Sequence, residues 1–182
     1  IIDQFRLEDV NSASAFFDLK KLAHINGEYI RALSVPQFVD AASPWLLGSA
    51  PWPAERFDIP TFEAIAPEIQ TRVAMLSEVP GYVDFLFLET PEYDEASWGE
   101  GIAKHPENAA AVLDAVAAAY ADVEWSSDAL MGVISEVGEK LELPKKQWQA
   151  PVRIAVTGRS VGPPLGQSLE LLGRDETLRR LA

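Results

Sequence analysis

Apolar side chains recur at helical spacing through most of the chain, and this periodicity constrains the fold more than any other feature. One apolar stripe runs through 61–79 and predicts a helix of about four turns there, ended by Pro80-Gly81. Long alternation of apolar and polar residues, typical of half-buried strands, does not occur, and neither do internal repeats. We therefore expect an all-α fold. The stripe consists of Phe62, Ile65, Ile69, Val73 and Leu76.

Residues that start and end helices divide the rest of the chain. Asp18 can cap a helix over 18–33, and Ser34 with Gln37 forms a capping box for the next helix. The stretch 50–60 contains three prolines and is expected to be a loop. Gly158 is placed to end a helix in the left-handed conformation. Further helices are expected over 82–90, 106–123, 126–143, 146–157, 167–172 and 174–182.

An acidic stretch at 90–101, TPEYDEASWGEG, separates these expected helices into two sets of similar size. The sequence thus predicts two small helical-bundle subdomains in tandem. The first covers 1–95 and includes a junction helix at 18–33, and the second covers 96–182.

The charge is unevenly distributed along the chain. The 182 residues carry 28 acidic and 15 basic side chains, a formal net charge of −13, which argues against nucleic acid as a partner. Residues 140–182, however, hold eight basic and four acidic side chains. A basic end on an acidic body suggests a surface that faces a polyanion. The alternative is a solvated basic helix end without a binding role.

Several classes of chemistry are excluded by what the sequence lacks. It has no cysteine, so disulfides, zinc ribbons and thiolate nucleophiles are ruled out, which fits a reducing cytosol. Phosphate-binding glycine signatures and the serine-nucleophile motif are also missing. His24 and His105 lack metal-ligand spacing, so we expect no metal site. The carboxylates of 91–100 are expected to form a solvated linker, so no catalytic residue is predicted.

No targeting segment opens the chain, no apolar run is long enough to span a bilayer, and no initiator Met is present. We expect the chain to be a piece of a longer protein.

The string His24-Ile25-Asn26-Gly27 is unusual because an Asn-Gly pair disfavours the helix interior in which it lies. We expect His24 to be a helix-face residue, Gly27 to permit close approach of another helix, and Asn26 to bond backbone at the subdomain junction.

Three stretches, in order and at compatible spacing, resemble signatures of bacterial glutamyl-tRNA synthetase. They are FDLKKLAHINGEYIRAL at 17–33, TRVAMLSEVPGYVDFLF at 71–87 and APVRIAVTGRSVGPPLGQSLELLGRDETLRRL at 150–181. The resemblance implies that the chain is the anticodon-binding region of such an enzyme, made of two α-helical subdomains. The two ATP signatures of the catalytic half are absent, and the HING string lacks the second histidine of one of them.

The resemblance also implies how the chain works. The whole enzyme ligates glutamate to its tRNA with ATP and Mg²⁺, whereas this piece holds no cofactor, contributes recognition only and is expected to be inactive alone. Its expected partners are the tRNA(Glu) anticodon loop and the catalytic N-terminal half of the same parent chain. We expect a cytoplasmic monomer without membrane contact. The alternative is an acidic helical protein-interaction module that does not bind RNA.

The resemblance assigns tRNA contacts to five residues. Arg72 falls where the family reads the third anticodon base, and Arg153 falls on another tRNA contact. A guanidinium suits both positions because it can bond base edges or phosphate at two points. The first anticodon base is assigned to the GPPL turn, through Gly162, Pro163 and Leu165. Some relatives carry a hydroxyl residue at position 162, so Gly162 would leave only a main-chain contact.

Overall fold

The computed structural model describes residues 6, 17–48 and 50–182, and among these it contains ten α-helices and no strand. The predicted all-α fold is therefore confirmed. Two 3-10 turns, Ala54–Arg56 and Leu76–Glu78, and one π-helical turn, Gly99–Ala103, complete the described elements. The helices are α1 Leu19–Ala32, α2 Val35–Gly48, α3 Ile59–Gln70, α4 Val79–Phe87, α5 Glu95–Trp98, α6 Pro106–Tyr120, α7 Ser127–Lys140, α8 Lys145–Thr157, α9 Leu165–Leu172 and α10 Arg174–Leu181.

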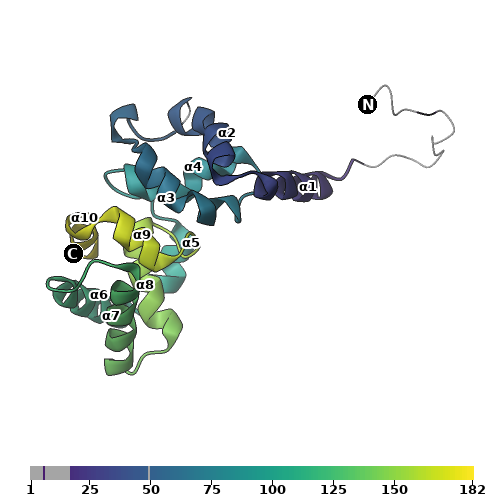
Figure 1. Cartoon of the computed structure of the whole chain (residues 1–182). Coiled ribbons are helices and arrows are strands. Elements are labelled where there is room, and N and C mark those ends of the chain that lie inside the picture. Colours follow the sequence, from purple (N-terminus) through teal and green to yellow (C-terminus); the bar gives the residue numbers. More distant parts are fainter. Residues whose placement is uncertain (1–5, 7–16, 49) are drawn as a thin grey trace.

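The first helical group, residues 19–88, packs α2, α3 and α4 around one core, while α1 extends away from it (Figure 1). The proline-rich loop before α3 contributes to this core, because Trp52 is 6% exposed and Phe57 meets Phe87 edge to face at 4.9 Å between ring centroids. Asp58 caps α3 by accepting the Thr61 N–H at 2.8 Å.

The prediction of one helix over 61–79 is wrong. The helix ends at Gln70, and the chain leaves it through a turn in which the carboxylate of Glu78 accepts the N–H groups of Ala74 and Met75 at 2.8 and 3.2 Å. Pro80, expected to break a helix, instead lies in the first turn of α4, where a missing N–H costs nothing. The turn still buries Val73, which is 1% exposed, so the apolar stripe reaches the core by another path.

The second helical group, residues 95–181, packs α6–α10 around a separate core. Tyr120 lies at its centre, fully buried, and its hydroxyl donates to the Leu130 carbonyl at 3.0 Å. The stretch expected to be a loop at 90–101 is helical from Glu95 onward, because Asp94 caps the Ser97 N–H at 2.7 Å and starts a helical turn. The bounds predicted for the two subdomains stay a prediction, and residues 1–5 and 7–16 of the first lie outside the described residues.

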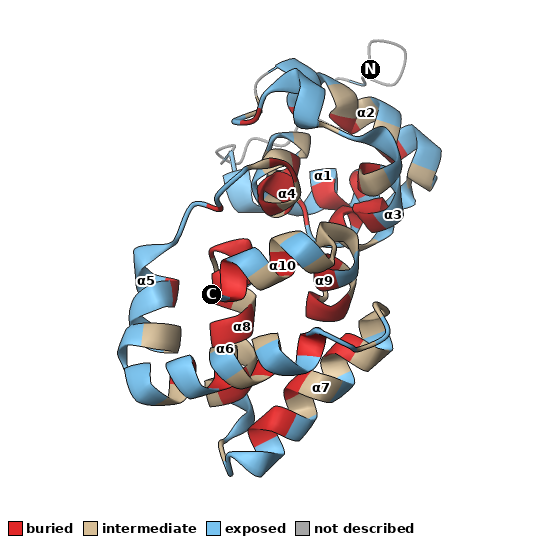
Figure 2. Ribbon diagram, turned by 90° about the vertical axis from the view of Figure 1, so that its left-hand side faces the viewer, coloured by how far each residue is buried: buried red, intermediate tan, exposed pale blue. Residues whose placement is uncertain are grey.

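Helix α9 joins the two groups: it lies next to α3 and α4, and its half-buried Leu171 packs against the first core (Figure 2). Four side chains of the second group also donate to acceptors on residues 64–89. We call this set of bonds the joint. Its donors are Arg159 to the Gly81 carbonyl and the Asp84 carboxylate, Gln167 to the Ala64 carbonyl, Arg179 to the Glu89 carbonyl, and Arg180 to the Phe85 and Leu88 carbonyls.

The Asn-Gly pair in α1 makes a backbone bond and a close approach as expected, but to a turn within the first group rather than to a helix at the subdomain junction. The side-chain amide of Asn26 donates to the Ala74 carbonyl, and a Cβ built on buried Gly27 would lie 3.5 Å from the Ala74 Cα. His24 is exposed on the helix face. Ala74 belongs to the turn after α3, so its contacts with Asn26 and Gly27 anchor α1 within the first group. No described helix is both long and apolar enough to cross a membrane.

Candidate nucleic-acid interface

The turn between α8 and α9, residues 158–164, brings two of the predicted contact residues, Gly162 and Pro163, beside a third, Arg153. Gly158 ends α8 with φ +79° and donates its N–H to the Ile154 carbonyl at 2.8 Å, as its position predicted. A Cβ at Gly158 would overlap the Glu92 carbonyl oxygen, so both conformation and space require glycine there.

Arg153 fastens this turn to α8, because its Nη1 donates to the Pro163 carbonyl at 2.7 Å. Burial lowers the pKa of the Arg153 guanidinium below its ordinary value, and the positive charge of Arg72 lowers it further. Lys145 and Lys146 line the same cavity as Arg153, and no carboxylate is among the described residues that line it, so these surroundings suit an anionic ligand.

Arg72 lies in the turn after α3, near enough to act on Arg153 although 81 positions separate them in sequence. Its Nη1 donates to the Glu68 carboxylate at 2.8 Å, to the Thr71 hydroxyl at 3.1 Å and to the Glu68 carbonyl. The side chain is 33% exposed. The structure thus brings Arg72 and Arg153, one from each helical group, to the same region.

Leu165 differs from the other predicted contacts because its side chain is 3% exposed and packs in the second core. Pro163 is also buried, whereas Gly162 is half-buried. A ligand at this turn would therefore meet Gly162 and the neighbouring main chain rather than the side chain of Leu165.

Sequence reasoning missed the ion pair between Arg159 and Asp84, which spans the two helical groups beside these residues. Asp84 is 6% exposed, and burial raises the pKa of its carboxyl above the ordinary value although Arg159 opposes this. A lone acid within the apolar run YVDFLF was the available signal, since a buried carboxylate needs a partner. Arg159, Gly162 and Pro163 line, with Tyr82 and Phe85 of α4, a largely apolar cavity of about 370 Å³ between the groups.

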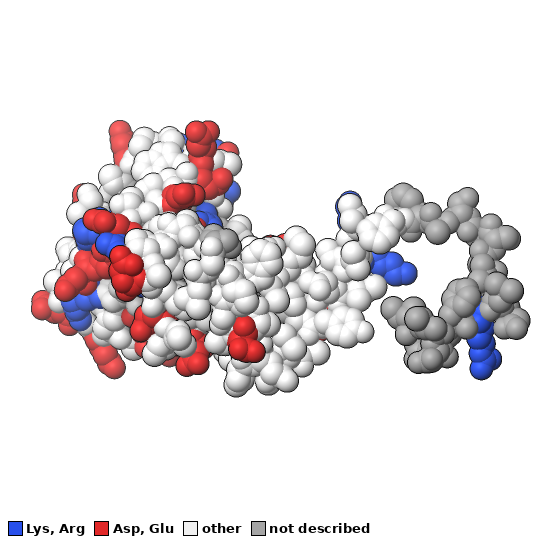
Figure 3. Space-filling model, turned by 90° about the horizontal axis from the view of Figure 1, so that it is seen from above, with Lys and Arg blue, Asp and Glu red and all other residues white. Residues whose placement is uncertain are grey.

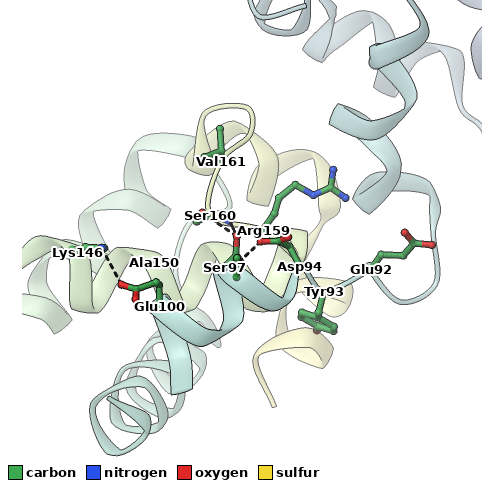
Figure 4. Close-up of a pocket in the computed structure, with 12 residues that line it drawn as sticks. Glu92, Tyr93, Asp94, Ser97, Glu100, Lys146, Ala150, Arg159, Ser160 and Val161 are labelled. Carbon is green, nitrogen blue, oxygen red and sulfur yellow. Dashed lines mark hydrogen bonds and ion pairs between the residues drawn. The ribbon is translucent and has the colours of Figure 1, made fainter. Parts of the chain in front are cut away.

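A larger cavity of about 780 Å³ lies on the other side of Arg159 (Figure 4). Its charged lining consists of Glu92, Asp94 and Glu100 against Lys146 and Arg159. Hydrogen bonds from Ser97 lower the pKa of Asp94, and the ion pair with Lys104 lowers that of Glu100. Both carboxylates are therefore charged at neutral pH, and this cavity is unsuited to a polyanion.

No group of three or more His, Cys, Asp or Glu side chains within the described ranges is placed to hold a metal ion. On the face seen in Figure 3, acidic side chains cover more of the helical body than basic ones, and most of that face is uncharged.

Comparison with known proteins identifies a family. The model of the anticodon binding domain family matches residues 37–182. Over its full length the chain is 52% identical to part of a glutamate–tRNA ligase from Thermobifida fusca and 49% identical to part of one from Salinispora arenicola. It spans about 38% and 39% of those two proteins, respectively.

Solved structures share the fold. A crystal structure of a glutamate tRNA ligase from Elizabethkingia meningosepticum, in complex with its amino acid, aligns with 99% of this chain at a TM-score of 0.76. The sequences are 19% identical, and the match covers 34% of that enzyme.

Proposed function

The chain belongs to the anticodon-binding domain family, and on that premise we propose that it recognises the anticodon of tRNA(Glu) as the non-catalytic C-terminal part of a glutamate–tRNA ligase. The observation that carries the proposal is Arg153, which donates to the Pro163 carbonyl of the 158–164 turn and whose pKa is lowered by the charge of Arg72 in the first helical group. Two guanidinium groups from different helical groups, one of them bonded to a structured turn, suit an unpaired RNA loop whose bases are read on their edges.

Each contact residue has a role in this proposal. Arg72 reads the third anticodon base, and its three internal bonds all use Nη1, which leaves the other edge of the fork for the base. Arg153 holds the turn and supplies positive charge. Gly162 and Pro163 present the main chain and an apolar rim to the first base, while Leu165 anchors that rim in the core. Correct bases gain hydrogen bonds, and wrong bases leave buried polar groups unpaired.

In the proposed parent enzyme, glutamate is joined to tRNA with ATP and Mg²⁺ by a catalytic part that precedes this chain, and the whole acts as a cytoplasmic monomer. The described residues offer no carboxylate cluster for Mg²⁺, and the sequence has no phosphate-binding glycine loop. The chain therefore does not fit ATP or Mg²⁺. Recognition alone is its contribution.

The test is a titration of the chain with two RNA stem-loops that carry a glutamate-type or a glutamine-type anticodon. Arg72→Gln should reduce the preference between them about tenfold or more, because a bidentate arginine–base contact is worth about 1–3 kcal/mol. The matched control is Arg56→Gln, which removes another partly exposed arginine, 43% against 33% for Arg72, that pairs with Glu89 at 3.3 Å in the same helical group.

A preference unchanged by Arg72→Gln would refute the role of Arg72. Failure of the unmodified chain to bind either stem-loop would refute the proposed function. It would then favour the protein-interaction alternative, which only the acidic composition supports.

A further inference from the structure

We propose that a groove along α8 binds the ribose–phosphate backbone of the RNA through Lys145, Lys146 and Gln149. The groove lies beside residues 158–164, which we call the base-reading turn. The proposal rests on the proposed function and adds a second contact area to it. Its ligand chemistry is a run of phosphodiester groups, as distinct from the base edges assigned to Arg72.

The groove is a cavity of about 590 Å³ whose polar lining includes Lys145, Lys146, Gln149, Arg153 and Ser160. Residues 145, 149 and 153 lie four positions apart on α8, so they follow one face of the helix over successive turns. The opposite wall is the 160–162 segment of the base-reading turn. A strand whose bases meet Gly162 would therefore continue directly into the groove.

The charge of this lining decides the class of ligand. Three cations, Lys145, Lys146 and Arg153, face the groove, and no carboxylate is among the described residues that line it. The larger cavity adjoins the groove, since Lys146, Ala150, Ser160 and Val161 line both, and it has three carboxylates against two cations. An approaching polyanion is thus favoured in the groove, which Lys145 and Arg153 line, over the adjoining cavity, which the three carboxylates line.

The two lysines are available to a ligand. Lys146 Nζ lies 3.9 Å from the carboxylate of Glu100, in a pair whose side chains are 77% and 62% exposed. Exposed pairs of this kind contribute little, and Glu100 keeps a closer partner in Lys104 at 3.1 Å. Ammonium groups on flexible stems act as point charges, which suits phosphates and carries no base preference.

The experiment measures the salt dependence of stem-loop binding by the chain and by the double variant Lys145→Gln/Lys146→Gln. Loss of two phosphate contacts should reduce the slope of log K against log salt by about 1.4, since each contact to a single strand contributes about 0.7. Preference between glutamate-type and glutamine-type anticodons should stay unchanged. The matched control is Lys20→Gln/Lys21→Gln, an adjacent exposed pair on α1 with the same change in charge.

An unchanged slope in the α8 variant, or an equal fall in the α1 control, would overturn the groove while leaving anticodon recognition intact. Absence of binding by the unmodified chain would overturn the proposed function and the groove together. Lysine-dependent binding of polyglutamate without stem-loop binding would assign the groove to an acidic protein partner and overturn the RNA proposal.

Discussion

Gly162 and Gly158 lie four positions apart and differ in whether the fold requires glycine at the position. Gly162 has no left-handed backbone angle, and a Cβ there would lie 3.7 Å from Arg153 Nη1, an ordinary contact. A side chain at this position therefore fits, although the residue lies at the rim of the proposed site.

We predict that Gly162→Ser leaves stem-loop affinity intact and raises the free energy of unfolding by about 0.4–1 kcal/mol, because it restricts the unfolded chain without straining the folded one. Urea unfolding and the binding titration would measure the two effects. The control Gly158→Ser should instead destabilise the fold by more than about 1–2 kcal/mol, since it adds overlap with the Glu92 carbonyl to left-handed strain. Equal stability of the two variants would contradict the argument.

At the scale of elements, α1 has few buried residues, Gly27 and Ile30, to hold it to the body, while much of its apolar surface is exposed. Polar bonds to backbone therefore matter for its position. Gln70 donates to the Ile30 and Leu33 carbonyls at 2.8 Å each and closes the end of α1, and Asn26 fixes its middle.

Replacing Asn26 with Ala should cost about 1 kcal/mol, the usual net value of one hydrogen bond, and the loss should be local to α1. Amide hydrogen exchange would show faster exchange in residues 20–32 with little change in α6 or α7. His24→Ala, an exposed neighbour on the same helix, should change stability by less than about 0.5 kcal/mol. Similar effects of both substitutions would show that the bond to Ala74 does not position α1.

Local sequence signals predicted most helices because their caps and stripes are local. The capping role of Asp18 is confirmed by its bonds to the N–H groups of Lys20 and Lys21. The break after Gln70 could not be predicted, because the apolar period continues through it. The interaction that competes with the helix is the bonding of Glu78 to the Ala74 and Met75 N–H groups, and glutamate is equally common on an exposed helix face.

The same contrast holds in the candidate site. Arg153, Gly162 and Pro163 lie within eleven residues, so a motif could place them together. Asp84 and Arg159 are 75 positions apart, and no local pattern joins them. The resemblance supplied Arg72, but only the structure shows its charge acting on Arg153.

At the scale of the whole molecule, Arg180 holds the two helical groups together. Its side chain is 2% exposed, pairs with Glu176 at 2.6 Å and donates to carbonyls of Phe85, Leu88 and Val156 at 2.7–3.0 Å. Burial lowers the pKa of Arg180, and the pairing with Glu176 opposes this shift. Its hydrogen bonds therefore compensate for the burial of a charge.

We predict that Arg180→Met lowers the free energy of unfolding by about 3 kcal/mol or more, because it leaves buried carbonyls in both helical groups without a donor. Urea denaturation followed by two probes, Trp fluorescence and far-ultraviolet circular dichroism, would detect the groups unfolding separately once the joint is weakened. The adjacent Arg179→Met removes an arginine whose side chain is 50% exposed and should cost about 1 kcal/mol or less. Equal losses from both would contradict a special role for Arg180.

The joint has one asymmetry with a consequence for how such chains diverge. Its donors are particular side chains, yet all its acceptors except Asp84 are backbone carbonyls, which every amino acid carries. As lineages separate, the acceptor positions can change identity without loosening the joint, whereas a change at Arg159, Gln167, Arg179 or Arg180 removes a donor, with the largest cost at the buried Arg180. Mutational tolerance should therefore differ between the two sides of one contact, and a second helical group that keeps these four donors could be grafted onto the first group of a distant relative.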